Sequence, residues 1–169
     1  MIDVIEKAKI FATAAHAAVG QLRKYTYEPY IVHPAEVAGI IDSLEGATAE
    51  MVAAAWLHDV VEDTGVTIET IRAEFGEKVA ELVGWLTDVS RPEQGNRATR
   101  KAIDRAHTAM ASAEAQTIKL ADLISNTRSI LEHDEKFAKT YLEEKRMLLE
   151  VMTKGDATLM AEARKYIGE

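Results

Sequence analysis

The sequence contains no cysteine among its 169 residues. Disulfide bridges, iron–sulfur clusters and cysteine-type zinc sites are therefore excluded, and a cytoplasmic location is the one that we expect. The chain also has only three prolines, and aromatic residues make up 6% of it. Together with plentiful alanine, leucine, glutamate and lysine, the scarcity of proline favours an all-α protein.

Long hydrophobic runs are also lacking. No apolar stretch approaches the roughly 18 residues that a membrane-spanning helix needs. The first residues, MIDVIEKAKIF, carry acids and lack the basic start of a signal peptide. The formal net charge of −8 would repel a phosphate backbone. We therefore expect neither a membrane nor a nucleic-acid polymer as a partner, although a local cationic pocket could still hold a small anionic substrate.

Apolar residues recur at helical spacing along most of the chain. They predict helices near 3–19, 34–44, 48–62, 77–87, 97–112, 114–131, 135–153 and 156–167, and a short helix that Thr67 caps and that ends at Phe75. Residues 21–34 read as an irregular loop, and residues 88–96 as a mobile one. Because no repeat or interdomain linker is visible, we predict one all-α domain of eight or nine helices over 1–169.

Ionisable residues crowd into WLHDVVEDTG, residues 56–65. If the segment is helical, His58 lies one turn before Glu62, and Asp59 lies one turn before Asp63. Neighbouring carboxylates repel one another, and a divalent cation would reverse that repulsion. The alternative is a solvated helix end that happens to be acidic.

Two distant residues bear on this choice. His33, in YIVHPAEVA, precedes a predicted helix in a loop held by two prolines, where it could be a rigid ligand or an ordinary capping histidine. Asp122 lies inside the apolar run of IKLADLISN, so it needs a partner. Lys119 and Asn126 share its helical stripe, so that a salt bridge and a metal remain open as explanations.

The order His33, His58-Asp59 and Asp122 resembles the metal-binding signature of HD-domain phosphohydrolases. The surrounding words GQLRK, PYIVHPAEVA, LHDVVEDT, FGEKVAELV and IKLADLISNTR resemble the hydrolase domain of RelA/SpoT proteins. In a chain of this length, the match is to the stand-alone small alarmone hydrolases, and it runs from about residue 9 to residue 152.

The resemblance implies an HD-domain helical bundle that holds one metal ion, usually Mn²⁺. The implied ligands are His33, His58, Asp59 and Asp122. Such a mixed imidazole and carboxylate set also suits Fe²⁺, Co²⁺ or Zn²⁺. Glu62 and Asp63 match the acidic pair that orients or deprotonates the attacking water in this family.

The implied reaction removes the 3′-pyrophosphate of guanosine alarmones, giving GDP or GTP and pyrophosphate. The residues that the resemblance assigns to the substrate are Arg23, Lys24, Asn126 and Tyr141. A cationic stretch at 91–105, which includes Arg100, could close over the pyrophosphate or could equally be a solvated helix face.

Several alternatives remain open. Tyr27 stands close to the Pro-Tyr pair where many relatives have glycine, so an adenosine alarmone is a possible substrate. Another HD phosphohydrolase, such as a 5′-nucleotidase, would share the metal ligands, and a non-catalytic nucleotide-binding domain is a third hypothesis. We expect His16, His107 and His133 to be structural or surface residues. The sequence does not predict an oligomeric state.

Overall fold

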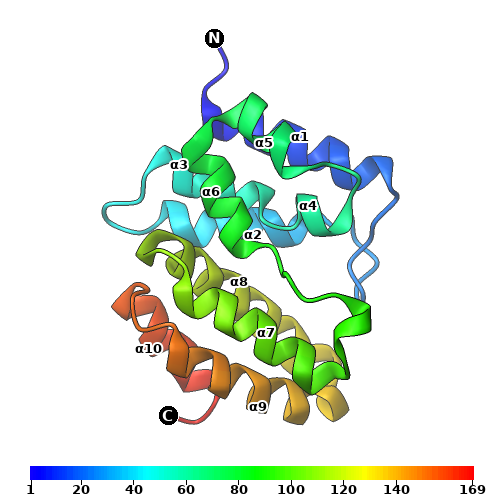
Figure 1. The fold of residues 1–169 in the computed structure, drawn as a ribbon, viewed down its shortest axis with the longest axis vertical. Coiled ribbons are helices and arrows are strands. Elements are labelled where there is room, and N and C mark those ends of the chain that lie inside the picture. Colours follow the sequence, from blue (N-terminus) through cyan, green and yellow to red (C-terminus); the bar gives the residue numbers. More distant parts are fainter. The chain divides into compact units, whose positions relative to one another are not determined.

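The structure is a computed structural model that describes residues 1–169, and it is all α-helical, as the sequence predicts. The chain forms two compact units, Met1–Thr87 and Asp88–Glu169, which are described separately (Figure 1). None of the helices combines the length and the apolar character required to span a membrane.

The first unit is built around a buried helix, α3 (Ala49–Leu57). It packs against α1 (Val4–Ala18), α2 (Val32–Asp42) and α6 (Glu77–Leu86). Ala53, Ala54 and Ala55 are fully buried in its middle, and such small side chains allow neighbouring helices to approach closely. The remaining helices of the unit are α4 (Val60–Asp63) and α5 (Ile68–Phe75).

The second unit begins with a short 3₁₀ helix, η1 (Pro92–Gln94), and continues with four α-helices. These are α7 (Arg97–Met110), α8 (Ala113–His133), α9 (Glu135–Val151) and α10 (Ala157–Tyr166). The long α8 packs against α9 and α10, and α7 lies beside α9 (Figure 1). Between α9 and α10, a Cβ on Gly155 would lie 2.6 Å from Leu120 Cδ1, so glycine permits this close approach.

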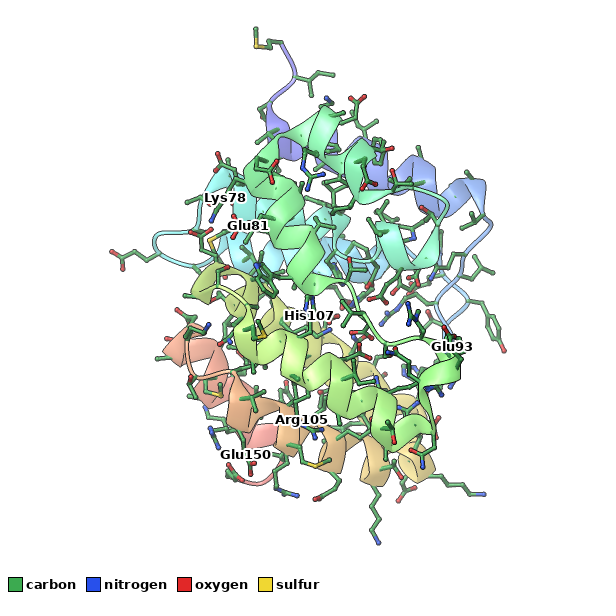
Figure 2. The ribbon with its side chains drawn as sticks, viewed as in Figure 1. Lys78, Glu81, Glu93, Arg105, His107 and Glu150 are labelled. Atoms are coloured by element: carbon green, nitrogen blue, oxygen red, sulfur yellow. The ribbon has the colours of Figure 1, made fainter.

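Side-chain caps set where most helices begin. Thr67 accepts a hydrogen bond from the Thr70 amide at the start of α5, which confirms the predicted cap. The same type of cap is made by Asp3, Thr48, Asn96, Ser112, Asp134 and Asp156. Charged side chains cover the outer helix faces, as where Lys78 Nζ lies 4.0 Å from Glu81 Oε2 on α6 (Figure 2).

The predicted continuous helix over 48–62 is wrong at one point. Helix α3 ends at Leu57 and α4 begins at Val60, so His58 and Asp59 form a turn between them. Asp59 has φ −101° and ψ −2°, which departs from regular helical geometry. Helical spacing therefore does not hold across the segment that carries the predicted ligands. After the turn, Thr64 ends α4 by donating its hydroxyl hydrogen to the Val60 carbonyl, 2.7 Å away.

Candidate metal centre and its surroundings

Three of the predicted metal ligands meet in the first unit. His33 lies in the first turn of α2, and His58 and Asp59 lie in the turn between α3 and α4. Their possible ligand atoms are all within 4.8 Å of one another. Asp59 Oδ2 lies 3.0 Å from His58 Nε2 and 3.7 Å from His33 Nε2. Both imidazoles are buried, with 0% and 1% of His33 and His58 exposed.

The hydrogen bonding of His58 fits a metal ligand. Its Nδ1 lies 2.7 Å from the Ala55 carbonyl oxygen, which can only accept, so Nδ1 carries the hydrogen. In the neutral imidazole, Nε2 then directs a lone pair at the Asp59 carboxylate, and two acceptors this close repel unless a cation or a proton lies between them. Metal-bound histidines commonly donate their other N–H to a backbone carbonyl in this way. The donor set therefore fits a divalent metal that accepts nitrogen and oxygen ligands.

Asp122, the fourth predicted ligand, belongs to the second unit. It lies on α8 and is 6% exposed. Its carboxylate accepts hydrogen bonds from Lys119 Nζ at 3.0 Å and from Asn126 Nδ2 at 2.8 Å. The helical stripe that the sequence predicts therefore exists, and it supplies the partners that a buried aspartate needs. A carboxylate has lone pairs for further partners, and the role of Asp122 as a ligand stays a prediction.

The acidic pair lies on α4, directly after the turn that holds His58 and Asp59. Both Glu62 and Asp63 reach solvent. Asp63 Oδ2 accepts a hydrogen bond from Gln21 Nε2 at 3.1 Å. Desolvation is the main cause that raises the pKa of Asp63 above its ordinary value, and the negative charge of Asp59 adds to it, whereas the Gln21 hydrogen bond opposes it.

The loop between α1 and α2 carries Arg23 and Lys24. It was predicted to be irregular, yet Leu22 and Pro29 form an antiparallel bridge within it. The Arg23 amide donates to the Glu28 carbonyl at 2.8 Å, which closes the loop further. Tyr27 has φ +60° near the loop end and is 74% exposed. The two predicted substrate cations therefore lie on an ordered hairpin-like loop.

The remaining predicted substrate contacts belong to the second unit. Tyr141 is only 6% exposed, and its hydroxyl accepts a hydrogen bond from Thr127 Oγ1 at 3.4 Å. Burial raises the pKa of Tyr141, so its phenol stays neutral. Arg100 on α7 has a buried Nε without a hydrogen-bond acceptor. Asn126 contacts Asp122 directly, as described above.

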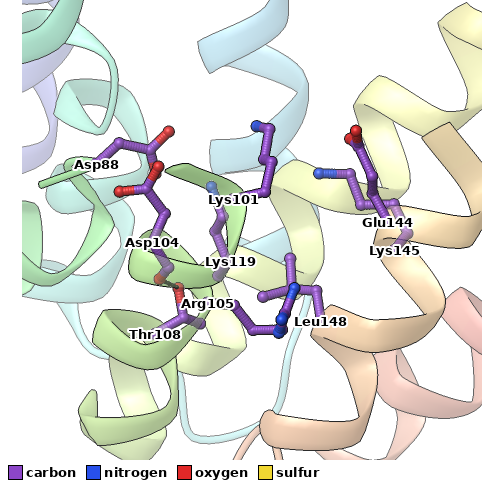
Figure 3. Close-up of a pocket in the computed structure, with 9 residues that line it drawn as sticks. All are labelled: Asp88, Lys101, Asp104, Arg105, Thr108, Lys119, Glu144, Lys145 and Leu148. Carbon is purple, nitrogen blue, oxygen red and sulfur yellow. Dashed lines mark hydrogen bonds between the residues drawn. The ribbon is translucent and has the colours of Figure 1, made fainter. Parts of the chain in front are cut away.

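A small hollow of about 50 Å³ opens in the second unit, and its lining includes the acids Asp88, Asp104 and Glu144 (Figure 3). Lysines from three helices line it, namely Lys101 on α7, Lys119 on α8 and Lys145 on α9. Burial, followed by the positive charges of Lys119 and Lys101, lowers the pKa of Lys145 to about 8. We call this group of three the lysine cluster.

Lys145 was not predicted from the sequence, although its spacing from Tyr141 is one that places two side chains on the same helix face. It lies four residues after Tyr141 on α9, and its Nζ lies 4.7 Å from the centre of the Tyr141 ring. Two further residues near the candidate metal centre, Gln21 and Tyr30, were not singled out either, although they lie inside the words GQLRK and PYIVHPAEVA.

Comparison with known proteins places these residues in a family context. A family model described as "HD domain" matches residues 8–149. A Synechocystis protein named probable guanosine-3′,5′-bis(diphosphate) 3′-pyrophosphohydrolase is 40% identical over 130 residues, which is 75% of this chain and 17% of that protein. A probable GTP pyrophosphokinase of Mycobacterium leprae is 38% identical over 130 residues, or 76% of this chain and 16% of that protein. The chain thus spans less than a fifth of the length of these relatives.

Solved structures share the fold. A metazoan orthologue of SpoT described as hydrolysing ppGpp superposes with a TM-score of 0.86 and is 24% identical, covering 98% of this chain and 94% of that one. The protein lmo0812 of Listeria monocytogenes EGD-e has a TM-score of 0.65 and is 26% identical, covering 84% of this chain and 97% of that one. The helical architecture is therefore that of known proteins over nearly the whole chain.

Proposed function

Because this chain belongs to the HD-domain family, we propose that it hydrolyses guanosine 3′,5′-bis(diphosphate) and similar alarmones at the 3′-pyrophosphate. The products are GDP or GTP and pyrophosphate. The observation that carries the proposal is the buried cluster of His33, His58 and Asp59, followed at once by the acids of α4. Its support from comparison is the similarity to proteins named for this reaction, from Synechocystis and from Aquifex aeolicus, the latter 34% identical over 148 residues.

We propose that Asp122 is the fourth ligand and that Mn²⁺ is the metal. A divalent metal bound by these residues lowers the pKa of a coordinated water and polarises a phosphoryl oxygen. The imidazole nitrogens and carboxylate oxygens of the set also suit other divalent transition metals. Lys119 and Asn126 hold the Asp122 carboxylate in one orientation, which favours its role as a ligand.

The acids of α4 handle the attacking water in this proposal. Water attacks the phosphorus bonded to O3′, the bond from that phosphorus to O3′ breaks, and O3′ leaves with its electron pair and takes up a proton. Glu62 and Asp63 orient the water and accept its proton. Because its pKa is raised, the Asp63 carboxylate is a stronger base than an ordinary aspartate.

Positive charge must be local, because the chain as a whole carries a formal charge of −8. The cations proposed to contact the substrate are Arg23 and Lys24 on the loop before α2, and Arg100 on α7. The lysine cluster provides a further place where phosphate oxygens would be bound, since an anion there offsets the repulsion among the three ammonium groups. Asn126 and Tyr141 complete the proposed set of substrate contacts.

A substrate panel tests the proposal. The protein, loaded with Mn²⁺, is incubated with guanosine and adenosine nucleotides that carry a 3′-pyrophosphate, and with ordinary 5′-monophosphates. We expect release of pyrophosphate from the guanosine alarmone and none in the presence of a chelator. Faster release of pyrophosphate from the adenosine nucleotide would identify adenosine alarmones as the preferred substrate. Orthophosphate from the monophosphates, with no pyrophosphate from alarmones, would overturn the proposal in favour of a nucleotidase.

A further inference from the structure

The base of the loop between α1 and α2 holds two uncharged polar residues side by side. The Tyr30 amide donates to the Gln21 carbonyl at 3.1 Å, next to the bridge between Leu22 and Pro29. From this shared base the two side chains reach different acids. The Tyr30 hydroxyl lies 2.6 Å from Asp59 Oδ2, and Gln21 Nε2 lies 3.1 Å from Asp63 Oδ2.

The contact of Tyr30 fixes the carboxylate that belongs to the metal centre. A phenol hydroxyl donates to an ionised carboxylate, and a separation of 2.6 Å is typical of a strong, charge-assisted hydrogen bond. It engages Oδ2, the same oxygen that lies 3.0 Å from His58 Nε2. The Tyr30 ring itself is held between two imidazoles, with ring centres 4.8 Å from His16 and 5.9 Å from His33. Tyr30 therefore has little freedom to release Asp59.

The contact of Gln21 is fixed by a histidine on its other side. Because the amide nitrogen faces the Asp63 carboxylate, the amide oxygen faces His16 Nδ1, which lies 2.8 Å away. That oxygen can only accept, so His16 carries a hydrogen on Nδ1. His16 is 1% exposed, and its Nε2 has no hydrogen-bond partner. Its interaction with Gln21 is thus the one polar contact that this buried imidazole makes, and it sets the direction of the Gln21 amide.

We infer that Gln21 and Tyr30 are positioning residues for the reaction proposed above, on which this inference rests. Tyr30 holds Asp59 toward the metal, and Gln21, oriented by His16, holds Asp63 toward the attacking water. Both act from the base of the loop that carries Arg23 and Lys24. One short loop therefore connects the proposed substrate cations with a metal ligand and with a proposed general base.

The arm through Tyr30 is tested by metal affinity. Calorimetric titration of the metal-free protein with Mn²⁺ should give a dissociation constant about tenfold higher for Tyr30→Phe, because outer hydrogen bonds to metal ligands commonly contribute 10- to 100-fold. Tyr27→Phe is the matched control, since it removes the same hydroxyl from the same loop at a residue that is 74% exposed. An unchanged Mn²⁺ affinity in Tyr30→Phe would overturn this arm, as would equal weakening in both variants.

The arm through Gln21 is tested by kinetics. Gln21→Met keeps the length of the side chain but removes both hydrogen bonds. We expect kcat to fall about tenfold, since small misplacements of catalytic groups are costly, with KM and Mn²⁺ affinity within about twofold of the parent chain. Gln21→Glu, which keeps an oxygen for His16 but places a second carboxylate beside Asp63, should not restore kcat. A kcat equal to that of the parent chain in Gln21→Met would overturn this arm.

The two measurements separate this inference from the proposed function. If the parent chain hydrolyses no alarmone while Tyr30→Phe still weakens Mn²⁺ binding, the proposed function fails and the role of Tyr30 stands. If alarmone hydrolysis is found and neither variant changes affinity or kcat, the function stands and the positioning role is refuted.

Discussion

Lys145 illustrates how the burial of one charged residue affects stability. Its ammonium group is largely buried, and two other lysines face it, so its pKa falls from 10.5 to about 8. Keeping this charge in the folded protein is therefore costly near neutral pH. Such a residue is a candidate for binding an anion, because a bound phosphate group would stabilise its charged form.

Replacing Lys145 by methionine should stabilise the protein at pH 7. The pKa of this group is lower in the folded chain than in the unfolded one, so the unfolded chain binds more protons between about pH 8 and 10.5. The free energy of unfolding of the parent chain should therefore rise with pH across that window. In Lys145→Met this rise disappears. The free energy of unfolding at pH 7 should increase by about 1 kcal/mol or more, and each kcal/mol corresponds to about 2–4 °C in Tm.

Thermal unfolding at a series of pH values checks this expectation. Lys139→Met on the same helix is the matched control, because Lys139 is exposed and its replacement should change Tm little. A stabilisation by Lys145→Met that is the same at pH 7 and above pH 10.5 would contradict the assigned cause, since a neutral lysine carries no charge to bury.

Glu62 allows the chemical step to be separated from metal binding. Its side chain is exposed on α4, so Glu62→Gln changes the charge without disturbing the packing of the unit. We expect Mn²⁺ affinity to be retained and kcat to fall by about 100-fold or more, the usual contribution of a positioned general base. Glu69→Gln, an exposed acid in the first turn of α5, should leave kcat unchanged. Turnover by Glu62→Gln at the rate of the parent chain would refute the role proposed for Glu62.

Helices are the elements that the sequence predicts best, because burying one face of a helix imposes an apolar period on its residues. The apolar period does not predict the turn between α3 and α4. Apolar residues flank it on both sides, from Trp56 and Leu57 to Val60 and Val61, so the period continues while the backbone does not. The apolar period therefore does not predict the point at which α3 ends.

The candidate site divides in a similar way. His33, His58 and Asp59 are predicted from their motif words, and the structure brings them together. Gln21 and Tyr30 also lie inside motif words, but their contacts escape prediction because their partners are 42 and 29 residues away. The lysine cluster is likewise not predicted from the sequence, because its members come from three separate helices.

The junction between α5 and α6 depends on Gly76, which gives a prediction for these elements. Gly76 has φ +89° and ψ 172°, a backbone conformation that residues with a Cβ rarely adopt, and no atom lies within 4 Å of the position that a Cβ would occupy. The cost of Gly76→Ala is therefore conformational, about 1–3 kcal/mol, and should lower Tm.

Gly39, inside α2, provides a control of opposite sign. It is exposed and helical, and a Cβ there would also meet no atom within 4 Å. Gly39→Ala should raise the free energy of unfolding by about 0.5–1 kcal/mol, because alanine favours the helix. Chemical denaturation of both variants checks the pair. Equal shifts of the same sign would show that backbone conformation is not what distinguishes these glycines.

For the whole molecule, the proposed metal is also a stabilising ligand. Anything that binds only the folded chain raises the free energy of unfolding, by about 2.7 kcal/mol when its concentration is 100 times the dissociation constant. The clustered residues His33, His58 and Asp59 belong to the first unit, and Asp122, the proposed fourth ligand, belongs to the second. Removing Asp122 therefore tests whether this residue contributes to metal binding.

Asp122→Asn should lose most of the increase in Tm that Mn²⁺ gives the parent chain, an increase of about 5–10 °C at such an excess. Asp104→Asn is the control, because Asp104 is a buried acid of the same unit that accepts hydrogen bonds from the amides of Val89 and Ser90 at 2.9 and 2.8 Å. It should lower Tm without metal yet keep the full increase upon adding Mn²⁺. Melting curves with Mn²⁺ and with a chelator measure both quantities. An undiminished increase in Asp122→Asn would exclude Asp122 from the ligand set, since a residue that binds the metal cannot be replaced without weakening the linkage between metal and folding.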